Sequence, residues 1–185
     1  SLGYGGKHPA THTHTTATTK EHSMGFFDNA PAQNANGLAP LSMDRVREIF
    51  DRNEINYAVD EDGDLVGGWD FGGFNFMALG AERDILCVRG TWYGELPLDR
   101  LDEVNAFTAA WNREHFWPKT CPIVSEEDTV RVVCEHVVAY QYGLTDDQLE
   151  DHLNCGLMTG NSLFEALNEA FPEAVEESQV EEREE

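Results

Sequence analysis

Residues 145–172 have the sequence TDDQLEDHLNCGLMTGNSLFEALNEAFP, and this stretch decides the fold. Thr145, followed three residues later by Gln148, is the pattern of a capping box at a helix N-terminus. Apolar residues then recur at helical spacing from Leu149 to Phe171, and a proline ends the helix. The sequence therefore predicts a long, amphipathic C-terminal helix with one buried face.

Two glycines, Gly156 and Gly160, lie on the apolar face of this predicted helix. Each costs a helix about 0.5–1 kcal/mol relative to alanine, so their presence indicates that another backbone approaches closely there. That backbone belongs either to the sheet of the same domain or to a partner subunit. In the second case the residues of a dimer or client interface would be Gly156, Leu157, Gly160 and Phe164.

Upstream of this helix, the apolar pattern predicts two more helices and about six strands. One helix starts after Ser42 as the N-cap, and the other starts near Leu98 and ends by Trp117. Alternating apolar residues predict strands at 55–59, 65–71, 74–79, 85–92, 121–124 and 129–140. The strands are joined by short turns, including one with Gly63 at positive φ, so antiparallel pairing is expected. The class is α+β, in the order helix, three or four strands, helix, two strands, helix.

The charge and composition of the chain exclude several classes of function. The chain has 35 acidic and 12 basic residues and a formal net charge of −23. So acidic a protein repels nucleic acid and anionic lipid, and no apolar run approaches the ~18 residues of a membrane span. We expect a cytoplasmic protein with three parts: a flexible segment and linker over 1–40, a domain over 41–172, and an acidic disordered tail over 173–185.

The reactive residue types form no recognisable catalytic or metal motif. The four cysteines make no C-x-x-C pair, and the acidic turn at Asp60 lacks the glycine and glutamate that a calcium loop needs. Cys134 and His136 share one face of a predicted strand, which would suit a metal or a nucleophile, but packing is the preferred interpretation. We therefore expect no metal, no cofactor and no catalytic residue.

One cluster could bind a ligand. Trp111, Asn112, Arg113 and His115 lie close to Trp117 at the end of the second predicted helix. A cation, an amide and an imidazole beside aromatic rings could form a binding pocket or an anion clamp. The alternative is structural: Arg113 pairs with nearby acids, Asn112 braces a loop, and the tryptophans belong to the core.

Several motifs resemble the YbjN-like family of bacterial proteins. They include Val88-Arg89-Gly90-Thr91-Trp92, Trp111-Asn112-Arg113-Glu114, Phe116-Trp117-Pro118-Lys119 and the block from Gly143 to Gly160. The resemblance covers about residues 41–172. It implies sensory-transduction regulation and a fold similar to type III secretion chaperones: a curved antiparallel sheet of five to six strands with helices on one side, commonly dimeric. It implies no established catalytic residue, cofactor or ligand.

These observations lead to a functional expectation. The protein is expected to be a non-enzymatic, chaperone-like binding or regulatory module in bacterial signalling or stress regulation. Its partner would be a protein client or a second copy in a homodimer, with no binding to nucleic acid or membrane. The alternative is a small-molecule or metal-binding sensor with a pocket around Asn112, Arg113 and His115.

Overall fold

The long C-terminal helix organises the fold. In the computed structural model, which describes residues 38–174, this helix is α3 (Asp146–Ala170) and runs for 25 residues. The Oγ1 atom of Thr145 accepts a hydrogen bond from the Gln148 backbone at 3.1 Å, and the Gln148 side chain accepts one from the Thr145 backbone at 3.0 Å. The predicted capping box is therefore confirmed.

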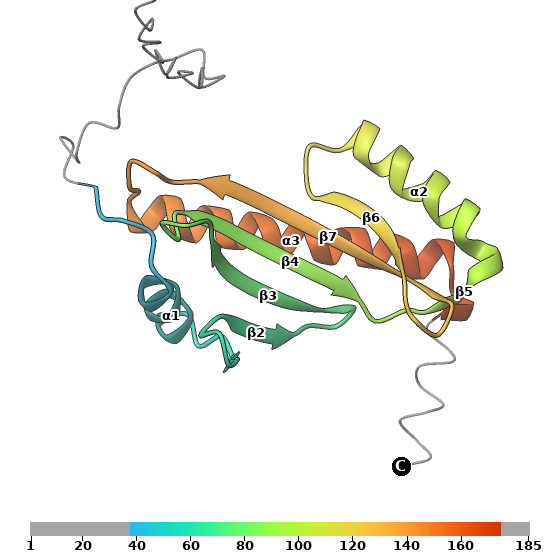
Figure 1. The fold of residues 1–185 in the computed structure, drawn as a ribbon, viewed down its shortest axis with the longest axis horizontal. Helices are drawn as coiled ribbons and strands as arrows, with labels where there is room; N and C mark the ends of the chain where they lie inside the picture. The colour runs from blue at the N-terminus through green and yellow to red at the C-terminus, as the bar shows by residue number, and fades with distance from the viewer. Residues whose placement is uncertain (1–37, 175–185) are drawn as a thin grey trace, which may run out of the picture. The chain divides into compact units, whose positions relative to one another are not determined.

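α3 lies along one face of a twisted antiparallel sheet (Figure 1). The central strands are β3 (Gly72–Leu79), β4 (Ile85–Trp92) and β7 (Thr129–Ala139). On each strand, alternate residues face the helix and form the core, among them Phe74, Phe76, Leu86, Val88, Val132 and Cys134. This alternation gives the sheet one covered face and one face that no described helix crosses, which we call the open face.

The two helix glycines allow α3 to sit directly on the sheet. A Cβ atom at Gly156 would lie 2.7 Å from the Cβ atom of Val88, and one at Gly160 would lie 2.6 Å from a ring carbon of Phe74. Both glycines are buried, and so is Phe164, whose ring centroid is 5.5 Å from that of Phe74. Of the two alternatives drawn from the sequence, the close contact seen here is with the sheet of the same chain. These three residues are therefore core residues of this chain, and Leu157 beside them is half-buried.

All pairings in the sheet are antiparallel. The strand order is β1 (Ala58–Val59), β2 (Leu65–Gly68), β3, β4 and β7. Val130 of β7 pairs with β5 (Leu96–Pro97) on one edge and with β6 (Lys119–Val124) on the other. The sheet thus has seven strands, two of which are only two residues long.

Two shorter helices complete the covered side. α1 (Met43–Arg52) is capped by Ser42, and its Phe50 packs edge-on against Phe76 with centroids 4.8 Å apart. α2 (Leu101–Glu114) follows a short 3-10 turn and contacts β6. Its Phe107 packs against Phe171 at the end of α3, 5.9 Å between centroids. The expected α+β class, with helices on one side of an antiparallel sheet, is confirmed.

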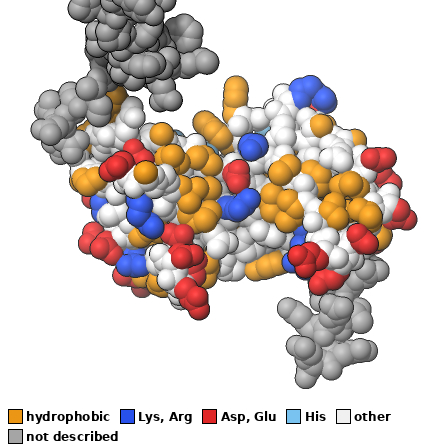
Figure 2. Space-filling model, in the orientation of Figure 1, with side chains coloured by type: hydrophobic (Ala, Val, Ile, Leu, Met, Phe, Trp, Pro, Cys, Tyr) orange, Lys and Arg blue, Asp and Glu red, His pale blue; other side chains and the backbone are white. Residues whose placement is uncertain are grey.

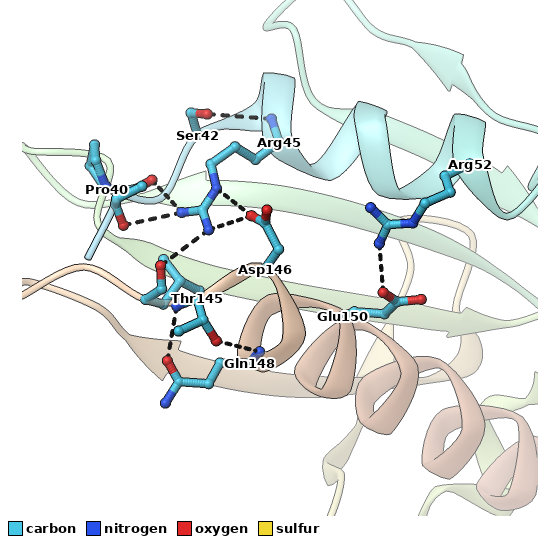
Figure 3. A network of polar contacts seen from close by, with 10 residues as sticks. Pro40, Ser42, Arg45, Arg52, Thr145, Asp146, Gln148 and Glu150 are labelled. Carbon is cyan, nitrogen blue, oxygen red and sulfur yellow. Dashed lines mark hydrogen bonds and ion pairs between the residues drawn. The ribbon is translucent and has the colours of Figure 1, made fainter. Parts of the chain in front are cut away.

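Arg45 ties the start of the domain to the start of α3 (Figure 3). Its guanidinium donates to the carboxylate of Asp146 at 2.6 and 2.9 Å and to the carbonyl oxygens of Ala39, Pro40 and Leu144. The side chain is 15% exposed, so this network is partly shielded from water. One side chain therefore links α1 and the segment just before it to the start of α3, about a hundred residues later in the sequence.

The structure corrects some predicted boundaries. The strand expected at 55–59 is limited to Ala58–Val59, and the one expected at 65–71 ends at Gly68, after which Trp69 turns onto the rings of Phe74 and Phe76. β5 was not predicted, because two residues are too few to show a period. The expected flexible N-terminal segment lies outside the described residues except for 38–40, and the acidic tail lies outside them except for 173–174.

The contact at Gly156 gives a prediction about stability. Glycine to alanine inside a helix normally stabilises a protein by about 0.5–1 kcal/mol. We expect Gly156→Ala to lower the free energy of unfolding by about 1–3 kcal/mol instead, because the new methyl group overlaps Val88. Urea denaturation measures the change, with Ser162→Ala on the exposed side of α3 as the control, expected to be nearly neutral. An increase in stability for Gly156→Ala would contradict the close packing.

Candidate functional site

The open face of the sheet carries two apolar groups. The register places the first across the ends of three strands: Met77, Leu79, Ile85, Cys87, Val137 and Ala139. The second lies toward the other end of the sheet and consists of Tyr93, Cys121, Ile123 and Val133. Val137 and Tyr93 are half exposed, at 52% and 51%. Figure 2 shows both orange areas on this side of the molecule.

A charged band separates the two apolar groups. Arg89 of β4, Glu135 of β7 and Lys119 of β6 lie in register across the open face. Glu135 accepts contacts from Arg89 at 3.3 Å and from Lys119 at 3.6 Å. The cationic side chains are 49% and 76% exposed, so these ion pairs contribute little to stability. Their positions instead leave both signs of charge available to a partner at the centre of this face.

A second ion pair lies beside the Tyr93 group. Arg131 donates to Glu95 at 2.8 Å through its Nε atom. The Thr129 hydroxyl, and then the Arg131 guanidinium, lower the pKa of Glu95 by hydrogen bonding to its carboxylate. The Glu95 carboxylate is therefore held ionised next to the second apolar group.

The cluster predicted around Trp111 is only partly brought together. Asn112 donates to the carbonyl of Thr120 at 2.8 Å and accepts from its backbone nitrogen at 3.0 Å, so it fixes β6 to α2. Arg113 is 70% exposed and pairs with Glu114, its neighbour in sequence. The His115 ring stacks on Trp111 with centroids 3.9 Å apart. Asn112 thus has the bracing role of the structural alternative, and Arg113 pairs with an acidic neighbour at the surface, as that alternative also has it.

Trp117 belongs to a different cluster, between β7 and α3. Its ring lies edge-on to His136, 5.7 Å between centroids, and the Nε2 atom of His136 lies 3.0 Å from Nδ1 of His152 on α3. Tyr140 covers the other side of His152 at 5.8 Å. His136 is 2% exposed, and its second ring nitrogen has no partner in the described part of the chain. The pair connects residues 16 apart on two different elements, and no local pattern marks such a contact.

The cysteine chemistry considered from the sequence does not suit a nucleophile. Burial raises the pKa of Cys134 to about 12 and that of Cys87 to about 11. Both thiols therefore stay protonated at neutral pH, whereas a reactive cysteine needs a lowered pKa. Cys134 and His136 do share the covered face, but Cys134 packs there against Gly160 and Gly90.

No metal-binding cluster of three His, Cys, Asp or Glu side chains occurs among residues 38–174. The acidic turn at Asp60 is closed by its own atoms, since the Asp60 carboxylate accepts from the backbones of Asp62 and Asp64 and Gly63 has a φ of 84°. The positive φ expected for Gly63 is confirmed. In the same part of the chain, no helix has both the length and the apolar character that crossing a membrane requires.

A family model described as "YbjN: Putative bacterial sensory transduction regulator" matches residues 42–169, well over half of the chain. The chain belongs to the YbjN family. A solved structure with a similar arrangement is the crystal structure of YbjN, "a putative transcription regulator from E. coli", with a TM-score of 0.62 and 12% identity. The similarity covers 72% of this chain and 96% of that one and shows a shared fold. No curated protein matches the sequence.

Membership of the YbjN family places the chain among proteins described as regulators, and the family description names no enzymatic activity. The candidate site that the structure presents is the open face. The family resemblance implied a sheet with helices on one side, and the apolar alternation along 74–79 and 85–92 is present in the sequence. Neither signal showed that residues such as Met77 and Ile85 lie on the uncovered side, because alternation alone does not say which face the helices cover.

The histidine pair gives a prediction about pH. Burial, and then the nearby His152, lower the pKa of His136 below its usual value of about 6.5. A proton therefore binds the unfolded chain more readily, and the free energy of unfolding should fall as the pH drops below about 6.5. Urea denaturation between pH 7.5 and 5.5 measures this slope.

The double variant His136→Phe/His152→Leu removes both rings and should flatten the slope over that range. Below about pH 5 the carboxylates titrate and add their own effect, so the comparison stops above it. A slope equal to that of the unmodified protein would show that the pair is not its source.

Proposed function

We propose that this YbjN-family protein is a regulator that acts by binding another protein, in a chaperone-like manner, through the open face of its sheet. The supporting observation is the arrangement on that face, where two apolar groups, each with side chains that are about half exposed, flank a band of paired charges. Exposed apolar groups rimmed by polar residues are typical of interaction sites. Binding without catalysis also agrees with the raised pKa of both buried thiols.

The two kinds of surface would have different roles in this interaction. Burial of the apolar groups would supply affinity, at about 25 cal/mol for each Å² removed from water before the costs of association. The charged band would set orientation, because a partner must match a positive Arg89 and Lys119 around a negative Glu135. A partner with one sign of charge at its centre would leave part of the band unmatched.

A second copy of the chain is the partner we propose first. In a symmetric dimer the same surface is used twice, so it must be complementary to itself. A band that contains both signs meets this condition, because Arg89 of one copy can face Glu135 of the other. A client segment from another protein is the second form of the same function, and it would use the same apolar groups.

Two matched substitutions test the role of the open face. Val137 of β7 lies on the open face and is 52% exposed, whereas Val59 of β1 lies elsewhere and is 49% exposed. Because both are surface residues on strands, Val137→Glu and Val59→Glu should have similar small effects on stability. Only Val137→Glu should disrupt binding, since it places a charge in the first apolar group.

Size-exclusion chromatography with light scattering measures self-association, and capture from a bacterial lysate with mass spectrometry measures other partners. The unmodified protein and Val59→Glu should give the same dimer or the same captured protein, and Val137→Glu should lose it. If both variants behave like the unmodified protein, or if Val59→Glu alone loses the partner, the open face is not the binding surface.

A further inference from the structure

A pocket of about 430 Å³ lies between α1 and α3, on the side of the sheet opposite to the open face. Its apolar part is formed by residues from both helices, from β3 and from the segment after α1: Ile49, Phe50, Ile55, Phe76, Leu153 and Leu157. Its polar part consists of Asn53, Glu150, Asp151 and Asn154. The volume is in the range of small-molecule sites.

The walls of this pocket are fixed by polar contacts. Arg52 of α1 binds Glu150 of α3 at 2.6 Å (Figure 3), and Asn53 donates to both Glu150 and the carbonyl of Ile49 at 2.9 Å. At the other end of α1, Arg45 holds Asp146 at the first turn of α3. These contacts link both ends of α1 to α3 and so fix the two helices that line the pocket.

The charge of the lining selects one class of ligand. The lining includes two carboxylates, Glu150 and Asp151, and no basic residue. Glu150 is engaged by Arg52 and Asn53. Asp151 is exposed and has no hydrogen bond or ion pair within residues 38–174, so no basic side chain neutralises its charge at the edge of the pocket.

We propose that this pocket binds a small organic cation, a primary amine that carries an aliphatic or aromatic tail. The tail would lie on Ile55 and Leu157, the half-buried apolar residues of the lining, and the ammonium group would bind the exposed Asp151 carboxylate with the Asn154 amide beside it. An organic anion would meet two negative charges. A bare metal ion would find only two carboxylates, one of them already paired, and no third ligand of the usual kinds within the described residues.

This site is separate from the proposed protein-binding face. Because the ligand would contact α1 and α3 together, it would bind the folded chain and stabilise it in proportion to its concentration. Leu157 would contact the ligand, since its half-buried side chain lines the pocket. A small ligand here would suit a sensory regulator, but the binding itself does not depend on the proposed function.

The test uses three six-carbon probes that differ only in their charge: hexylamine, hexanol and hexanoate. They are titrated into the ¹⁵N-labelled full chain at neutral pH, and the amide shifts are mapped by NMR. Hexylamine should shift residues around Leu153 and Asn154, with a dissociation constant about fivefold below that of hexanol. Hexanoate should bind most weakly.

Matched variants separate the pocket from general attraction to an acidic protein. Asp151→Asn should weaken hexylamine about fivefold, to the level of hexanol, whereas Asp147→Asn, the same change at another exposed residue of α3 that lies outside the pocket, should leave it unchanged. Leu157→Trp should fill the pocket and abolish the shifts. Asn154→Trp on the exposed rim serves the same purpose if Leu157→Trp does not fold.

Three results would overturn the proposal. The first is equal binding of hexylamine and hexanoate. The second is an equal effect of Asp151→Asn and Asp147→Asn, which would indicate attraction to the net charge of −23 alone. The third is a set of shifts that maps outside the pocket or persists in a folded tryptophan variant.

Discussion

The fold depends on the close contact between α3 and the sheet. Gly156 and Gly160 have no side chain, so the helix backbone rests on Val88 and Phe74, and the large apolar residues of β3, β4 and β7 that face it become buried. α1 and α2 fill the remaining space on the same side. The hydrophobic core is thus confined to one face, and the other face stays open and available for an interaction.

Local signals in the sequence predicted much of this fold. The capping box at Thr145, the N-cap at Ser42 and the bounds 85–92 of β4 could be predicted because each depends on neighbouring residues. The resemblance to the YbjN-like family added that the helices lie on one side. Contacts between distant residues could not be predicted, since nothing local marks them. The links from Arg45 to Asp146 and from His136 to His152 are of this kind, and so is the pocket between α1 and α3.

The candidate sites could not be predicted from local sequence patterns either. The sequence directed attention to Trp111, Asn112 and Arg113, because a cation, an amide and aromatic rings stood together. The structure uses Asn112 to hold β6 and leaves Arg113 paired with its neighbour at the surface. The open face and the pocket are instead each composed of residues from four or five separate segments. The pocket also contains one of the many acidic residues of the chain, Asp151, which has no basic partner among residues 38–174.

The central claim is that the open face is covered by a protein partner in the cell. Photo-crosslinking tests this directly, with p-benzoylphenylalanine placed at Leu79 on the open face or at Met158 on the exposed side of α3. We expect a discrete covalent adduct, with the mass of two chains or of one chain and a client, from the Leu79 variant and none from the Met158 variant. An adduct from Met158 with none from Leu79 would contradict the claim.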